Sequence, residues 1–361
     1  MNISGTRPRL GLGLERFSAL YLWALFIIVF GIWTPGEFLT SATLHSVATG
    51  QAISAMIAVA VLIPLACGEF DLSVGANANF TGIVAILVQV NLHWNVVLSV
   101  LFSVLLGVLI GAINGLIVVR LRVSSFIATL GMGSILAALL VIVTGSAQPA
   151  PVTSSAWNDF TQFSVGGTQI VVVYMLVLGV LAWWFLQHTP AGRYIFAVGG
   201  NREAARLSGV RVNWWSFSTL VISGGIAGLS GVLYTSLTGP SLTFGNSLLL
   251  PAFAAAFLGS TQLLPGRFNV WGTLIAIYVL ATGVQGLELV SGQQWLSDMF
   301  NGVALILAVA LAVGRQHRIS RGSGKRAARE RQDEPDVMAA AQQATDTQSE
   351  PLSLGSQPTG E

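Results

Sequence analysis

The distribution of charged side chains is the feature that most constrains what this chain can fold into. Residues 1–16 and 315–361 contain 18 of the 32 Asp, Glu, Lys and Arg residues, and the 298 residues between them contain only 14. In a water-soluble domain about a quarter of the residues are charged. The middle of the chain is therefore predicted to lie in lipid, which excludes a water-soluble enzyme, a secreted domain and a nucleic-acid-binding protein.

The apolar runs of this middle segment predict an all-α, polytopic membrane protein with about ten transmembrane helices. The runs cover residues 17–33, 45–66, 74–90, 95–119, 126–144, 168–186, 215–237, 248–258, 270–288 and 295–313. The run 248–258 is shorter than the roughly 20 residues that a crossing helix needs. It either extends toward residue 262 or forms a re-entrant segment.

The basic residues predict the orientation of these spans, because Lys and Arg prefer the cytoplasmic side of a membrane. With a cytoplasmic N-terminus, all 17 basic residues fall in the inner segments and the outer loops contain none. The inner segments are 1–16, 67–73, 120–125, 187–214, 259–269 and 314–361. We therefore expect both termini to be cytoplasmic.

Three regions follow from this pattern: a cytoplasmic tail 1–16, a membrane domain 17–314 and a cytoplasmic tail 315–361. The second tail is basic up to residue 331 and then polar with few large apolar side chains, so it is predicted to be disordered. Its basic part suits either binding to anionic membrane lipid or, as its composition favours, retention of the tail in the cytoplasm.

The sequence contains no motif for covalent chemistry. The stretch closest to a phosphate-binding loop, at residues 322–326, has Arg326 where a Ser or Thr is required. The lone Cys67 excludes a disulfide within the chain, and no cluster of metal ligands is present. We expect neither a catalytic site nor a metal or cofactor. Glu69 and Asp71, the only close acidic pair in the membrane domain, leave an intramembrane enzyme as a remote alternative.

The longest polar insertion, residues 187–214, is predicted to form two short helices on the cytoplasmic side. Thr189-Pro190 favours a helix start and Gly199-Gly200 a break. Asn201 is then expected to cap a second helix that ends at Gly209. An arginine-rich helix pair suits the docking of a partner, although composition alone also fits an ordinary cytoplasmic loop.

Within this insertion the sequence resembles a known family. Residues 203–209, EAARLSG, resemble the EAA---G coupling motif of bacterial ATP-binding-cassette importer permeases, and the sequence from Thr189 onward resembles the cytoplasmic loop of ribose-type sugar permeases. Further similar stretches are GEFDLSVG at 68–75, NGL at 114–116, SFIATLG at 125–131 and LGST at 258–261. The resemblance covers residues 45–313, but Glu69 stands where the family has glycine.

The resemblance implies the permease subunit of an importer in the bacterial inner membrane, moving a monosaccharide such as ribose or xylose by alternating access. It implies a partner ATPase, a periplasmic or lipid-anchored sugar-binding protein and a second permease chain, which we expect to be identical. It also implies that particular residues of the insertion couple the permease to the ATPase. These are Arg193, Asn201, Glu203, Ala204, Ala205 and Gly209.

An uncharged sugar needs hydrogen-bonding and stacking groups along its route, and the spans supply candidates. The predicted pathway residues are Asp71, Asn77, Thr81, Asn114, Phe126 and Thr129. Asn77 and Thr81 are four residues apart and share a helix face, whereas Asn79 is expected to bond to another helix. For any one of these residues, bonding between helices is the alternative role. An ion-coupled secondary carrier remains the alternative function, weakened by the scarcity of ionisable residues in the spans.

Overall fold

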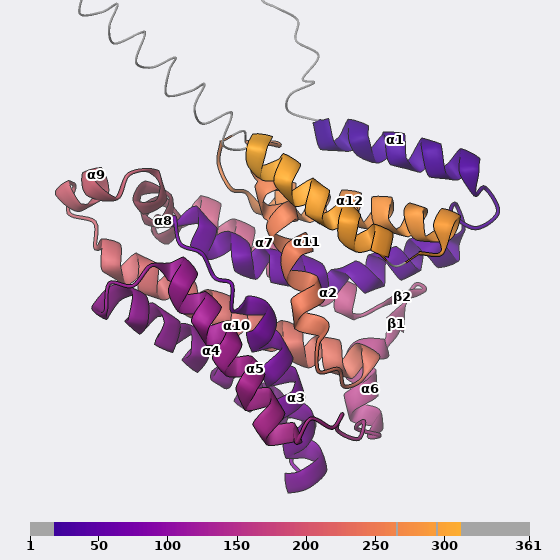
Figure 1. Ribbon diagram of the computed structural model, residues 1–361, viewed down its shortest axis with the longest axis horizontal. Helices are drawn as coiled ribbons and strands as arrows, with labels where there is room; N and C mark the ends of the chain where they lie inside the picture. Colours follow the sequence, from indigo (N-terminus) through magenta and orange to yellow (C-terminus); the bar gives the residue numbers. More distant parts are fainter. Residues whose placement is uncertain (1–17, 265, 294, 312–361) are drawn as a thin grey trace, which may run out of the picture. The chain divides into compact units, whose positions relative to one another are not determined.

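The computed structural model describes residues 18–264, 266–293 and 295–311, and these residues are almost entirely helical (Figure 1). The predicted tails 1–16 and 315–361 lie outside the described residues. The elements are α1 (Ser18–Trp33), α2 (Ser41–Ala66), α3 (Val74–Leu92), α4 (Val96–Arg120), α5 (Ser125–Thr144), α6 (Ser155–Gln162), β1 (Ser164–Val165), β2 (Thr168–Gln169), α7 (Val171–His188), α8 (Pro190–Gly200), α9 (Arg202–Leu207), α10 (Val212–Thr238), α11 (Phe244–Ser260) and α12 (Val270–Ser291), followed by a helix at Trp295–Leu311.

Among the described residues, seven helices are long and apolar enough to cross a membrane: α2, α3, α4, α5, α7, α10 and α12. Three shorter apolar helices, α1, α11 and Trp295–Leu311, coincide with the other predicted runs. The prediction of an all-α membrane protein is thereby confirmed. The short run 248–258 belongs to the 17-residue helix α11, which begins four residues earlier than predicted.

Helix α6 and the two-residue antiparallel pair β1–β2 were not predicted from the sequence; both lie in the segment 145–167 or directly after it. Helix α6 carries too few apolar residues to register as a span. It is held by tertiary contacts, because Trp157 is buried and its carbonyl oxygen accepts a hydrogen bond of 2.6 Å from Ser236 Oγ in α10. Such contacts leave no periodic signal in the sequence.

Helix α10 packs along α4 and α3 through glycines (Figure 1). A Cβ atom added to Gly107 of α4 would lie 2.5 Å from the carbonyl oxygen of Gly224, and one added to Gly231 would lie 1.9 Å from that of Ala78 in α3. Backbones can approach this closely only where no side chain intervenes, as is common between membrane helices. This close packing fixes α3, α4 and α10 against one another.

Helix α2 is deeply buried from residue 52 onward, since every residue from 52 to 66 is buried. It contacts α7, α10, α11 and α12. After Ala66 the chain leaves the helix at Gly68, whose φ of +80° is a left-handed conformation that favours glycine. Residues 67–73, which we call the break, then lead into α3.

Candidate functional site

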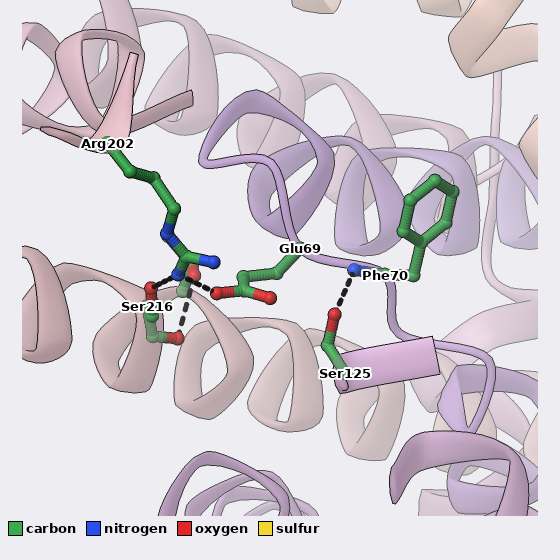
Figure 2. Close-up of polar contacts among 6 residues, drawn as sticks. Glu69, Phe70, Ser125, Arg202 and Ser216 are labelled. Carbon is green, nitrogen blue, oxygen red and sulfur yellow. Dashed lines mark hydrogen bonds and ion pairs between the residues drawn. The ribbon is translucent and has the colours of Figure 1, made fainter. Parts of the chain in front are cut away.

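The N-terminal turns of α5 hold the backbone of the break. Ser125 Oγ accepts a hydrogen bond of 3.0 Å from the backbone N–H of Phe70, and Thr129 Oγ1 accepts one of 3.0 Å from that of Leu72 (Figure 2 shows the first). Buried N–H groups outside helices require such partners. The SFIATLG stretch therefore supports the backbone of the break directly. Its two hydroxyl groups lie four residues apart on one face of α5 and accept these two hydrogen bonds.

Asp71 is the centre of a polar network within the bundle. Its Oδ1 accepts a hydrogen bond of 2.6 Å from Ser73 Oγ, and its Oδ2 accepts one of 2.8 Å from Ser223 Oγ in α10. Asn114 Nδ2 in α4 donates to Ser73 Oγ at 2.8 Å. Burial raises the pKa of the Asp71 carboxyl, and the hydrogen bonds from Ser73 and Ser223 lower it. The network connects the break to α4 and α10.

The two asparagines at the start of α3 both bond to other segments. Asn77 Nδ2 donates to the carbonyl oxygens of Gly107 and Gly224 at 3.3 Å each, and Asn79 Nδ2 donates to that of Leu242, before α11. Thr81 Oγ1 donates to the carbonyl of Asn77 at 2.7 Å, within its own helix. The structure thus gives Asn77 the interhelical bonds expected of Asn79, and it places Asn77 and Thr81 in a packed interface.

Three buried amide oxygens of this region have no hydrogen-bond partner among the described residues, namely Asn77 Oδ1, Asn79 Oδ1 and Asn114 Oδ1. A buried amide oxygen normally accepts at least one hydrogen bond. Asn77 lies at the glycine contacts between α3, α4 and α10, because it donates to Gly107 and Gly224, and Asn114 belongs to the Asp71 network, because it donates to Ser73.

Phe126 differs from the other predicted pathway residues, because nearly half of its surface (49%) is exposed. Its ring lies 6.3 Å from that of Phe70 in an edge-on arrangement, and the Phe70 ring stacks on that of Phe253 in α11 at 6.5 Å. Aromatic faces of this kind can stack against the apolar face of a sugar ring. The cluster lies at the same end of α5 as the hydroxyls that hold the break.

The insertion 187–214 forms α8 and α9 as the sequence predicts. Thr189 Oγ1 accepts from the N–H of Gly192 at 3.3 Å, and Asn201 Oδ1 accepts from that of Ala204 at 3.0 Å, so both residues cap helices. Gly209 adopts a φ of +82° two residues after α9 ends. Among the predicted coupling residues, Arg193, Asn201, Glu203, Ala204 and Gly209 are exposed, whereas Ala205 is buried.

Arg202, the first residue of α9, joins the insertion to the break. Its Nη2 donates to Glu69 Oε1 and, at 2.6 Å, to Ser216 Oγ in α10 (Figure 2). Neither Arg202 nor Ser216 was predicted as a site residue. A usable signal existed, since Glu69 is the only acidic residue of the break besides Asp71 and the inner loop 187–214 offers four arginines.

A cavity of about 780 Å³ lies beside this ion pair. Its lining includes Glu69, Phe70, Arg122, Ser125, Arg202 and Ser216. Among the residues that the structure describes, no group of three or more His, Cys, Asp or Glu side chains could hold a metal ion. The lining of the cavity combines hydrogen-bonding groups, the Phe70 ring and the ion pair of Glu69 with Arg202.

Comparison with known proteins identifies the family. The sequence profile of the family described as "Branched-chain amino acid transport system / permease component" matches residues 43–309. No solved structure matches the chain significantly.

Three curated relatives extend this match over most of the chain. The ribose import permease protein RbsC of Escherichia coli (strain K12) is 33% identical over 301 residues, which are 82% of this chain and 92% of that protein. RbsC of Bacillus subtilis (strain 168) is 33% identical over 80% of this chain and 89% of its own length. The fructose import permease protein FrcC of Rhizobium meliloti is 30% identical over 81% and 83%. The chain therefore belongs to the family of ribose-type permeases of ATP-binding-cassette importers.

Proposed function

We propose that this permease carries a monosaccharide across the bacterial inner membrane by alternating access, driven by a partner ATPase. The observation that carries the proposal is that the break 67–73 is bonded both to a buried polar network and to the exposed helix pair α8–α9. Relatives named as import permeases for ribose and fructose support a sugar as the solute. The solute-binding protein would deliver the sugar from outside, and a second copy of the chain would complete the route.

The proposed topology has ten spans, formed by the seven long helices and the three shorter apolar ones. Both termini and the insertion 187–214 would then be cytoplasmic, in agreement with the positions of all 17 basic residues. In this arrangement the exposed helices α8 and α9 face the cytoplasm. They are therefore available to the ATPase, which would dock on Arg193, Asn201, Glu203, Ala204, Ala205 and Gly209.

The proposed route runs past the Asp71 network and includes Asn77, Thr81, Asn114, Phe126 and Thr129. The unpartnered oxygens Asn77 Oδ1 and Asn114 Oδ1 support it, because sugar hydroxyl groups can donate to them. Both residues are buried, so the helices packed around α3, α4 and α10 would have to move to admit the sugar. Such a change is what alternating access requires, and the partner supplies its free energy through differential binding to the two states.

Reconstitution tests this function. The permease would be placed in liposomes with the ATPase and solute-binding protein encoded beside it, and uptake of labelled ribose, xylose, allose and fructose would be measured. We expect uptake of at least one sugar that requires both ATP and the binding protein. Glu203→Arg, an exposed position of α9, should leave membrane insertion intact and abolish the ATP-driven uptake. Uptake driven by an imposed ion gradient without the ATPase would instead establish a secondary carrier.

A further inference from the structure

We infer that the ion pair between Glu69 and Arg202 is the contact through which the docking helices α8 and α9 move the break, so that Arg202 and Glu69 are positioning residues for coupling. The inference rests on the proposed function. Glu69 belongs to the break inside the membrane domain, whereas Arg202 begins α9 on the exposed insertion, 133 residues later. Arg202 is not part of the EAA---G pattern, and Glu69 stands where the resembled family has glycine.

The two partners lie in different environments. The Glu69 side chain is only 3% exposed, while the Arg202 side chain is 50% exposed. A buried carboxylate depends strongly on its counter-charge, because removing one partner leaves an uncompensated charge in a medium that solvates it poorly. A displacement of α9 that left the break in place would create this situation. The break and α9 are therefore expected to move together.

A backbone contact reinforces the ion pair at the neighbouring end of α8. A Cβ atom added to Gly199 would lie 2.2 Å from the carbonyl oxygen of Ala66, the last residue of α2. One added to Gly68 would lie 3.5 Å from the Cα of Gly199. The junction of α8 and α9 thus touches the first residues of the break. The insertion holds the break by two adjacent contacts, one between backbones and one between charges.

On its other side, the break is hydrogen-bonded to helices α5 and α10. Phe70, the residue after Glu69, bonds through its N–H to Ser125 of α5, and Asp71 bonds to Ser223 of α10. Arg202 itself also bonds to α10 through Ser216. Figure 2 shows Glu69 and Phe70 side by side on the break, one directed to Arg202 and the other bonded to Ser125. A movement received at Glu69 is thereby passed to the helix ends that surround the proposed route.

The test uses the complete complex of permease, ATPase and solute-binding protein in liposomes. It measures the amount of ATPase that copurifies with the permease, the rate of ATP hydrolysis and the sugar imported per ATP hydrolysed. For Glu69→Gln and Arg202→Gln we expect normal copurification, continued hydrolysis and about tenfold less sugar imported per ATP, a size typical of coupling between sites. A residue with a merely structural role would lower the amount of complex and leave this ratio unchanged.

Two further variants make the test specific. Arg202→Lys keeps the positive charge and should retain most of the import ratio, although it loses the second hydrogen bond of the guanidinium. Arg120→Gln is the matched control, because it removes an exposed positive charge at the end of α4, outside the contact; it should behave as the wild type. If Glu69→Gln yields little folded protein, the two Arg202 variants decide the question, since half of that side chain is already exposed.

The possible failures can be told apart. A wild-type complex that imports no sugar with ATP would refute the proposed function itself. If the wild type imports sugar and both Glu69→Gln and Arg202→Gln import as much sugar per ATP as the wild type, the inference is overturned while the proposed function stands. Loss of ATPase copurification in these variants would also overturn it, because the ion pair would then serve docking rather than transmission.

Discussion

Replacing Gly231 with alanine tests the glycine packing that fixes α10 against α3. The added Cβ would lie 1.9 Å from the carbonyl oxygen of Ala78 and 2.7 and 2.9 Å from its carbonyl carbon and Cα. Ordinary contact begins near 3.4 Å, so the two helices must part locally by about 1.5 Å. Overpacking costs about 1–3 kcal/mol, and the upper end applies here because backbone atoms must move. We therefore expect Gly231→Ala to lower the free energy of unfolding by about 3 kcal/mol, roughly a hundredfold in the folding equilibrium.

Gly50→Ala is the matched control for this change. Gly50 lies in α2 with no atom within 4 Å of an added Cβ, so alanine there should alter the free energy of unfolding by no more than about 1 kcal/mol. Unfolding of both purified variants in detergent would be followed by SDS titration with tryptophan fluorescence. Equal unfolding midpoints for Gly231→Ala and Gly50→Ala would refute the close approach of α3 and α10.

Three other predictions test the site and the topology. Asp71→Asn replaces one of the two carboxyl oxygens that accept hydrogen bonds from Ser73 and Ser223 with an NH2 group that cannot accept, and we expect about 2 kcal/mol lower stability in the same SDS titration; an unchanged midpoint would contradict the network. Asn77→Leu should lower sugar uptake or change which sugar is taken up, whereas Asn79→Leu should mainly lower the yield of folded protein. Both are measured in uptake assays normalised to yield. If Asn77→Leu takes up sugar at the normal rate and with the normal selectivity, Asn77 does not belong to the route. Single cysteines at residues 159 and 208 should be labelled from opposite sides of intact cells, and equal labelling from outside would contradict the ten-span topology.

The helices could be predicted closely because lipid restricts the backbone so strongly. A chain in the bilayer must satisfy its N–H and C=O groups within helices, so apolar runs and helices coincide. The predicted run 270–288 begins at the same residue as α12, and the predicted run 126–144 ends at the same residue as α5. The helix caps at Thr189 and Asn201 were also predictable, because capping depends on residues within one turn.

The contacts of the site could be predicted only in part. The motifs pointed to Asp71, Asn114 and Thr129, which the structure connects around the break, but no local pattern tells which side chain each one meets. The pairing of Glu69 with Arg202 spans 133 residues and has no periodicity. Asn77 was placed on the correct helix, but its packing against α4 and α10 depends on glycines whose close approach only the fold reveals.

The glycine contacts also have a mechanical consequence. At Gly107, Gly111, Gly224 and Gly231 the helices α3, α4 and α10 meet backbone to backbone, so no side chain at these points can change rotamer and let one helix slide past another. A small displacement would disturb many atoms at once, since close-packed groups transmit strain rather than absorb it. Much of this trio should behave as a stiff frame, and the joints of the molecule should lie at its borders, for example at α5, where a Cβ added to Gly131 meets no atom within 4 Å and one added to Gly133 meets none closer than 3.9 Å. The search for moving parts should begin at those borders.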